Sequence, residues 1–189
     1  MIVAGFDQAP KNIGWAYGAP GSIPTRGVKA VPDFGENTAR LGEYVREWTT
    51  TFLKSCGANR AYDEQIIVRK VGLNVPVLSR QFKVQLSIET AAAQIGMLDD
   101  VYEVDIGDWR REFYLGKRPT KGQGTESEAW KDMALVECAR RGWLVEDHNA
   151  AEACGIWWYG CCHSDRRLLN NHKVEARRAE LKRWNSEAI

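Results

Sequence analysis

The segment IVAGFDQAPKNIGWAYG, residues 2–18, contains two apolar runs separated by a turn. The first run, Ile2 to Asp7, ends on a carboxylate, and residues 8–12 have the composition of a turn. The second run extends from Ile13 to Tyr17. Two short apolar runs this close together predict an antiparallel pair of strands. The prediction places the side chain of Asp7 at an edge of the sheet, where the turn begins.

The spacing of apolar residues predicts the elements that follow. Leu41, Val45, Trp48 and Phe52 recur at helical spacing, so residues 37–54 are expected to form an amphipathic helix capped by Asn37 or Thr38. The other predicted elements are strands at 27–31, 61–68 and 101–104, and helices at 78–97, 125–141, 147–159 and 173–184. Strands that alternate with helices in this order predict an α/β fold with a mixed sheet flanked by helices.

The composition is that of a globular protein, with 189 residues, 44% hydrophobic and 27% charged. We expect one domain at 1–162 and a basic C-terminal tail or helix at 163–189. No apolar run reaches the length of a membrane span, and the N-terminus lacks the features of a signal peptide. An odd number of cysteines, five, favours free thiols over a disulfide framework. A cytoplasmic protein without a membrane partner is therefore expected.

Three carboxylates are candidates for one metal site. Asp7 ends the first predicted strand, Glu64 lies in the fourth, and Glu152 lies near the start of the helix at 147–159. Acids that converge from two strands and a facing helix repel one another and need a cation. Hard oxygen ligands select Mg²⁺, with Mn²⁺ as a substitute. Strand alternation leaves Asp63 as a rival of Glu64, and Glu89 is a second rival.

Three motifs, in order, resemble those of the RuvC-type Holliday junction resolvases of the ribonuclease H-like superfamily. The hairpin at 2–18 resembles the first hairpin of that family, and Glu64-Gln65 resembles its acidic Glu-Gln. The segment DHNAAEACGIW, residues 147–157, is similar to the closing DxxDA motif, in the DNAAD-like version that phage and prophage relatives show. The resemblance implies a ribonuclease H-like mixed sheet whose first three strands are antiparallel.

The same resemblance implies a function. Family members are divalent-metal-dependent crossover junction endodeoxyribonucleases, which resolve four-way or branched DNA as homodimers by paired nicks. It further implies two Mg²⁺ ions per site and a protein of a bacterial cell, which a phage could encode. The implied catalytic residues are Asp7, Glu64, Glu152 and Asn149, and Asp147 and His148 are further candidate metal ligands.

Two departures from the family pattern concern the closing motif. Glu152 replaces the usual final aspartate, and Asn149 stands where the family has an acid or a histidine. Asn149 is a neutral ligand, so Asp147 or His148 could complete the shell instead. These departures keep two alternatives open. One is a less selective ribonuclease H-like nuclease that acts on DNA or RNA, and the other is a non-catalytic nucleic-acid-binding module.

Basic residues cluster in the segment 109–124, which we interpret as a loop. Trp109, Phe113 and Tyr114 lie among these charges and could either stack against an opened junction or anchor the core. The tail beyond residue 163 is also basic and could lie on DNA or form a solvated helix. The predicted DNA contacts are Lys11, Arg110, Arg111, Lys117, Arg118 and Lys121.

Overall fold

A computed structural model describes residues 1–66, 74–119 and 125–187, and in the last range the side chains up to residue 181. Lys121 and residues 67–68 lie outside the described residues. The fourth strand, expected at 61–68, ends at Glu64, and residues 65–66 do not belong to it. The elements are β1 Val3–Asp7, β2 Asn12–Gly18, β3 Thr25–Ala30, α1 Thr38–Cys56, β4 Arg60–Glu64, α2 Val75–Gln94, η1 Leu98–Asp100, β5 Val101–Val104, α3 Ile106–Phe113, α4 Glu126–Arg140, α5 His148–Ser164 and α6 Arg166–Glu187.

The five strands form one mixed sheet in the order β3-β2-β1-β4-β5. The pairs β1–β2 and β2–β3 are antiparallel, whereas β4 is parallel to both β1 and β5. The first three strands are therefore antiparallel, as the sequence predicted. In the β1–β4 register Phe6 pairs with Asp63, so Asp7 and Glu64 follow side by side at the same edge of the sheet.

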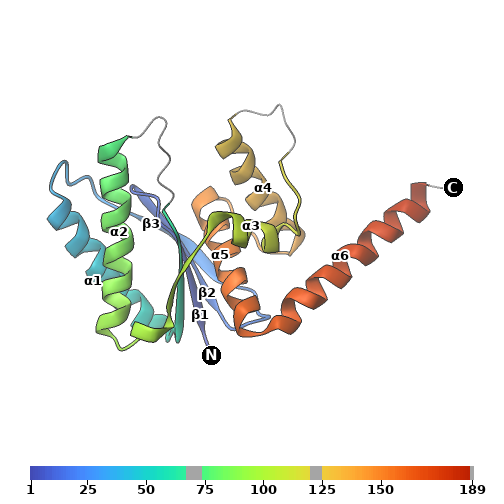
Figure 1. Cartoon of the computed structure of the whole chain (residues 1–189), viewed down its shortest axis with the longest axis horizontal. Coiled ribbons are helices and arrows are strands. Elements are labelled where there is room, and N and C mark those ends of the chain that lie inside the picture. Colours follow the sequence, from blue (N-terminus) through green and yellow to red (C-terminus); the bar gives the residue numbers. More distant parts are fainter. Residues whose placement is uncertain (67–73, 120–124, 188–189) are drawn as a thin grey trace.

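Helices cover both faces of the sheet (Figure 1). α1 and α2 pack together on one face, over a core that includes Phe6, Ile13 and Ile88. α5 lies on the other face against β1 and β2, and α3 and α4 pack against α5. The core on this side includes Trp109 and Trp157. α5 is therefore sandwiched between the sheet and two further helices, which accounts for its almost uninterrupted burial from Ala150 to Trp158.

Glycines in the sheet let α5 approach closely. A Cβ atom built on Gly14 would overlap the backbone of Asn149, and one built on Gly5 would lie 2.5 Å from the backbone nitrogen of Trp157. Only a residue without a side chain allows such an approach. The strands thus hold the start of α5 directly over the end of β1.

The helix starts follow local capping chemistry. Asn37 accepts a hydrogen bond from the backbone of Arg40, and Thr125 forms a capping box with Glu128. Of the two caps that the sequence offered for α1, Asn37 and Thr38, the structure uses Asn37. The helix predicted at 78–97 begins earlier, at Val75, because Asn74 caps it, and it ends at Gln94.

Three further predicted elements differ from the structure in kind or length. The segment after β5 is not wholly a loop, because residues 106–113 form α3 with Asp105 as its cap. The last helix starts at Arg166 rather than at 173, immediately after α5, which itself continues to Ser164. The expected boundary at 162/163 thus falls inside α5.

Candidate active site

The ends of β1 and β4 supply two acids on one face of the sheet. Asp7 is the last residue of β1, and Glu64 is the last residue of β4. Successive side chains of a strand point to opposite faces, so Glu64 faces α5 whereas Asp63 faces the α1–α2 side. The amide of Gln8, from the same side, donates a 2.6 Å hydrogen bond to Oδ2 of buried Asp63. Glu64, and not its rival Asp63, therefore joins Asp7.

Helix α5 supplies the third acid. Asn149 and Glu152 are three positions apart in the first turns of α5, and therefore lie on one face of the helix. Both line a pocket of about 420 Å³ together with Asp7 and Glu64. The structure thus brings together the four predicted catalytic residues, from two strands and one helix.

The carboxylates that line this pocket repel one another. Burial, followed by the charges of Glu152 and Glu64, raises the pKa of Asp7 well above its usual value. Burial and the charge of Glu152 likewise raise the pKa of Glu64 to about 7. In addition, the Oδ2 atom of Asp7 is buried and has no hydrogen-bond partner among the described residues. A buried acceptor without a donor, next to other acids, fits the chemistry of a cation site.

Helix α3 donates hydrogen bonds to two of the three acids. Nε1 of Trp109 donates to Oε2 of Glu64 over 2.9 Å, and Nη2 of Arg110 donates to Oε1 of Glu152 over 2.9 Å. Within the described ranges, no group of three or more Asp, Glu, His and Cys side chains is arranged to hold one ion as it stands. Glu64 and Glu152 would have to turn from α3 toward Asp7 before the three carboxylates could share one ion.

Solved structures with similar folds are known at low sequence identity. The RuvC of Thermus thermophilus in complex with a Holliday junction substrate is 12% identical, with a TM-score of 0.61, covering 84% of this chain and 92% of that one. A second structure of Thermus thermophilus RuvC is 16% identical, with a TM-score of 0.58 and the same coverage. The yeast mitochondrial Holliday junction resolvase Ydc2 is 10% identical, with a TM-score of 0.56, covering 93% of this chain and 83% of that one. No protein-family model and no curated protein matches the sequence.

The chain has the RuvC-type, ribonuclease H-like fold. The expected fold is thereby confirmed, with its mixed sheet and flanking helices. In this RuvC-type fold, no helix of the described residues is both long and apolar enough to cross a membrane.

Two further candidate ligands lie beside the pocket rather than in its lining. Oδ1 of Asp147 accepts hydrogen bonds from the backbone of Asn149 and Ala150, at 2.7 and 3.2 Å, and so caps α5. His148 lies toward α4, with Nε2 3.9 Å from a carboxylate oxygen of Asp132. Asn149, whose Nδ2 donates to the backbone carbonyl of Asn12 over 3.2 Å, lines the pocket. Asn149 is therefore better placed than Asp147 or His148 to complete a metal shell.

The predicted DNA contacts occupy different environments of the RuvC-type fold. Arg110 lines the pocket, whereas Arg111 is exposed and pairs with Asp108 at 2.7 Å. Lys11, Lys117 and Arg118 are exposed, as a contact with a phosphate backbone requires. Lys121 lies outside the described residues.

The aromatic residues of α3 belong to the core. Trp109, Phe113 and Tyr114 are at most 2% exposed and pack on one another. The core interpretation is therefore correct, and stacking of these three rings against an opened junction is wrong.

Sequence reasoning missed one cation of the pocket. Lys131 of α4 lines the pocket and opposes the rise of the pKa of Asp7. Ser127, one turn earlier on the same helix, lines it too. Their spacing of four residues was visible in the sequence, but the position of α4 relative to β1 was not.

Proposed function

We propose that this protein is a divalent-metal-dependent endonuclease that cuts four-way or branched DNA by paired nicks. The observation that carries the proposal is the convergence of Asp7, Glu64, Glu152 and Asn149 on one pocket of a RuvC-type fold. Support also comes from the neighbours, because one is a RuvC in complex with a Holliday junction substrate and another is a resolvase by name.

Asp7, Glu64 and Glu152 would hold Mg²⁺ or Mn²⁺, with Asn149 completing the shell. Two such ions, when bound, supply a water of lowered pKa and stabilise the leaving oxygen of the phosphodiester. The residues of the chain position the DNA. Lys131 and Arg110, the two cationic side chains that line the described pocket, would contact the oxygens of the scissile phosphate. This contact requires Arg110 to leave Glu152.

The wider DNA surface would include the exposed residues that flank the pocket. Lys11 lies in the turn after Asp7, and Arg111, Lys117 and Arg118 follow Arg110 along the chain. Lys121 remains a predicted contact of the same segment. Their role is to bind the backbone on both sides of the scissile phosphate, which fixes position without reading sequence.

Paired nicks require two active sites. Because the described part of the chain forms one such pocket, we infer that two copies act together as a homodimer. The outer face of α2 exposes Phe82 and Leu86, which are 46% and 56% exposed and lie one turn apart. Exposed apolar side chains that adjoin on a helix suit an interface. A second copy on this face would bury them symmetrically and place two pockets in one particle.

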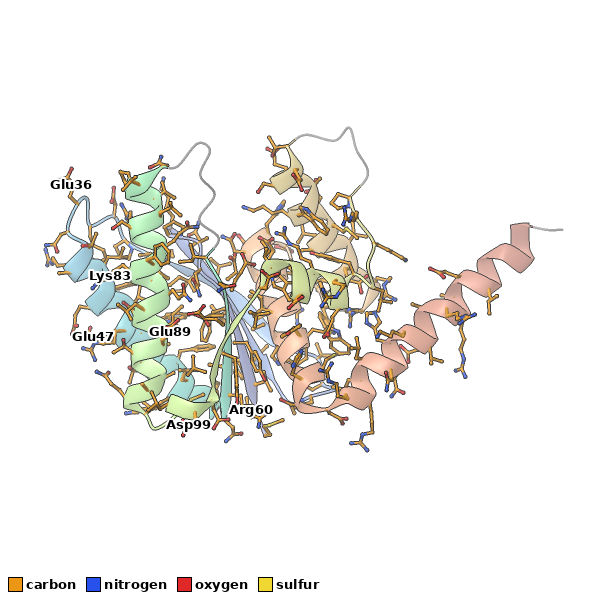
Figure 2. All side chains as sticks on the ribbon, in the orientation of Figure 1. Glu36, Glu47, Arg60, Lys83, Glu89 and Asp99 are labelled. Atoms are coloured by element: carbon orange, nitrogen blue, oxygen red, sulfur yellow. The ribbon has the colours of Figure 1, made fainter. Side chains whose placement is uncertain are left out.

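The test is cleavage of a synthetic four-way junction, beside linear duplex and single strand, with Mg²⁺ and with EDTA. Asp7→Asn should abolish cutting because it removes a charged ligand. Asp99→Asn is the matched control, since exposed Asp99 lies near Arg60, the first residue of β4, at the end of the sheet opposite the pocket (Figure 2).

Paired nicks in the junction alone, lost with EDTA and in Asp7→Asn but kept in Asp99→Asn, would support the proposal. Equal cutting of all substrates would indicate the less selective nuclease. Junction binding without cutting in either Mg²⁺ or Mn²⁺ would contradict the enzyme and leave a binding module.

A further inference from the structure

Helix α6 leaves the body of the protein as a single projecting rod (Figure 1). Leu169 and His172, in its first two turns, are each only 5% exposed. Beyond them the helix turns into solvent, and every residue from 177 to 181 is exposed. A polar helix without a core of its own, held at one end, is suited to contact something outside the chain.

Buried side chains fix the direction of this rod. The ring of His172 lies edge-on to that of Trp158, with 5.5 Å between the ring centroids. Its two nitrogens lie 2.8 and 3.0 Å from Nη2 of Arg141, whose guanidinium in turn covers the Trp158 ring at 4.3 Å. Because these groups are packed together, the first turns of α6 are held against α4 and α5. The outer turns continue the same helix axis into solvent.

Basic residues of α6 lie on its solvent side. With about 3.6 residues per turn, five cationic positions fall within an arc of roughly 140° that contains no acid. This arc, the basic face of α6, consists of Arg166, Arg167, Asn170, Lys173, Val174, Arg177, Arg178 and Leu181. Glu175 and Glu180 lie on either side of it. Lys173, Arg177 and Arg178 form no ion pair with any side chain that the structure describes.

The basic face adjoins the DNA contacts predicted near the pocket. Nζ of Lys117 lies 4.0 Å from Oε1 of Glu180, so the segment after α3 runs beside α6. Lys117 and Arg118 on this segment are exposed. Lys117 and Arg118 thus lie on the segment that connects α3, which carries Arg110 of the pocket, with the side of α6.

We propose that the basic face of α6 binds the phosphate backbone of a duplex arm outside the cleavage pocket, an inference that rests on the proposed function. From Arg166 to Arg178 the face is about 18 Å long, a length over which duplex DNA carries roughly ten phosphates. Five cations along such a length equal the roughly five phosphates that one strand of the duplex carries over it, at about one per 3.4 Å. A second copy of the chain fits less well, because a two-fold axis would set the same cations against one another.

The experiment measures binding without cutting, in full-length protein carrying Asp7→Asn. The test variant adds Lys173→Gln and Arg177→Gln. The control variant instead adds Arg40→Gln and Lys54→Gln, which remove the same charges from exposed sites on α1. Each protein is titrated with junctions whose arms are short or are longer by about one helical turn (~10 base pairs), at several salt concentrations.

We expect the parent protein and the control to bind long arms more tightly than short ones. The test variant should lose this gain, bind long arms about tenfold more weakly, and show a salt slope smaller by about two, at roughly 0.9 per lost phosphate contact. Arm-length dependence that is absent from the parent, or is kept in the test variant, would overturn the inference and leave the nuclease intact. Loss of self-association in the test variant, measured by sedimentation, would assign the face to a second copy instead. Absence of all DNA binding would overturn both the inference and the proposed substrate.

Discussion

The guanidinium of Arg110 donates a hydrogen bond to the carboxylate of Glu152 over 2.9 Å, and the two side chains are only 17% and 8% exposed. An ion pair this buried places a positive charge where the proposed site needs a cation. Arg110 therefore competes with a divalent ion for Glu152.

Arg110→Gln should bind Mn²⁺ more tightly than the wild type. We expect a gain of roughly tenfold, because a charge a few Å away at an effective dielectric of about 20 interacts by more than ~1 kcal/mol. Isothermal titration calorimetry without DNA measures this affinity. Arg111→Gln is the control, since Arg111 is exposed and pairs with Asp108. Weaker binding by Arg110→Gln would mean that Arg110 instead positions Glu152 for the ion.

Metal affinity should rise with pH up to about 7. Burial and the charge of Glu152 raise the pKa of Glu64 to about 7, so below that pH an ion must displace a proton. We expect the affinity for Mn²⁺ to fall up to about tenfold per pH unit below 7, with protons released on binding. Affinity that does not change between pH 5.5 and 8 would contradict an ionised Glu64 as a ligand.

The stability of the metal-free protein should change with pH in the opposite sense. Folding raises the pKa of Glu64 from 4.5 to about 7, so the folded protein holds this proton more tightly than the unfolded chain. The protonated carboxyl therefore adds to the free energy of unfolding, and this added stability is lost as the pH rises from 4.5 to about 7. In EDTA the melting temperature should therefore fall over this range. Glu64→Gln should reduce the fall, whereas Glu36→Gln, at an exposed site before α1, should leave it unchanged.

Gly14→Ala should damage both stability and the site. The added methyl would overlap the backbone of Asn149, so α5 must move away from β2, at a cost of about 1–3 kcal/mol or more. Gly57→Ala provides the comparison, because it has φ +65° and open space, and strains only the backbone. Denaturant unfolding gives both costs. Weaker Mn²⁺ binding in Gly14→Ala, but not in Gly57→Ala, would confirm that the approach of α5 sets the pocket.

Asp63→Asn should preserve both metal binding and junction cutting. Burial, followed by the charges of Glu89 and Glu103, raises the pKa of Asp63 well above its usual value. Asp63 does not line the pocket, and the amide oxygen of asparagine can still accept the hydrogen bond that Gln8 donates. Asp7→Asn makes the same change on the other face of the sheet and should abolish cutting. If Asp63→Asn also abolished cutting while remaining folded, the assignment of the two faces would be wrong.

The strands and their acids could be predicted because their causes are local. The period of two along β4 separates Asp63 from Glu64, and parallel pairing with β1 then brings Glu64 beside Asp7. Asp147, which the sequence offered only as a candidate ligand, caps α5 instead, a role that aspartate before a helix commonly takes.

Helix α3 could not be recognised from its own sequence. Four of its eight residues are charged, so the segment resembles a solvated loop. What stabilises it is the burial of Trp109 and Phe113, four residues apart, against Gly155 of α5. The same packing brings Arg110 to Glu152, and the packing of α4 against α5 brings Lys131 to the pocket. Both cations thus depend on tertiary contacts that no local pattern contains.

The buried Oδ2 of Asp7, which lacks a donor, also has an evolutionary consequence. In the absence of metal this acid opposes folding, so the neutral amide would give a more stable protein without its activity. Selection for thermal stability alone would therefore remove Asp7 early and leave the fold intact. On the proposed function, a lineage that no longer needed to cut DNA would therefore drift toward an inert protein of the same shape.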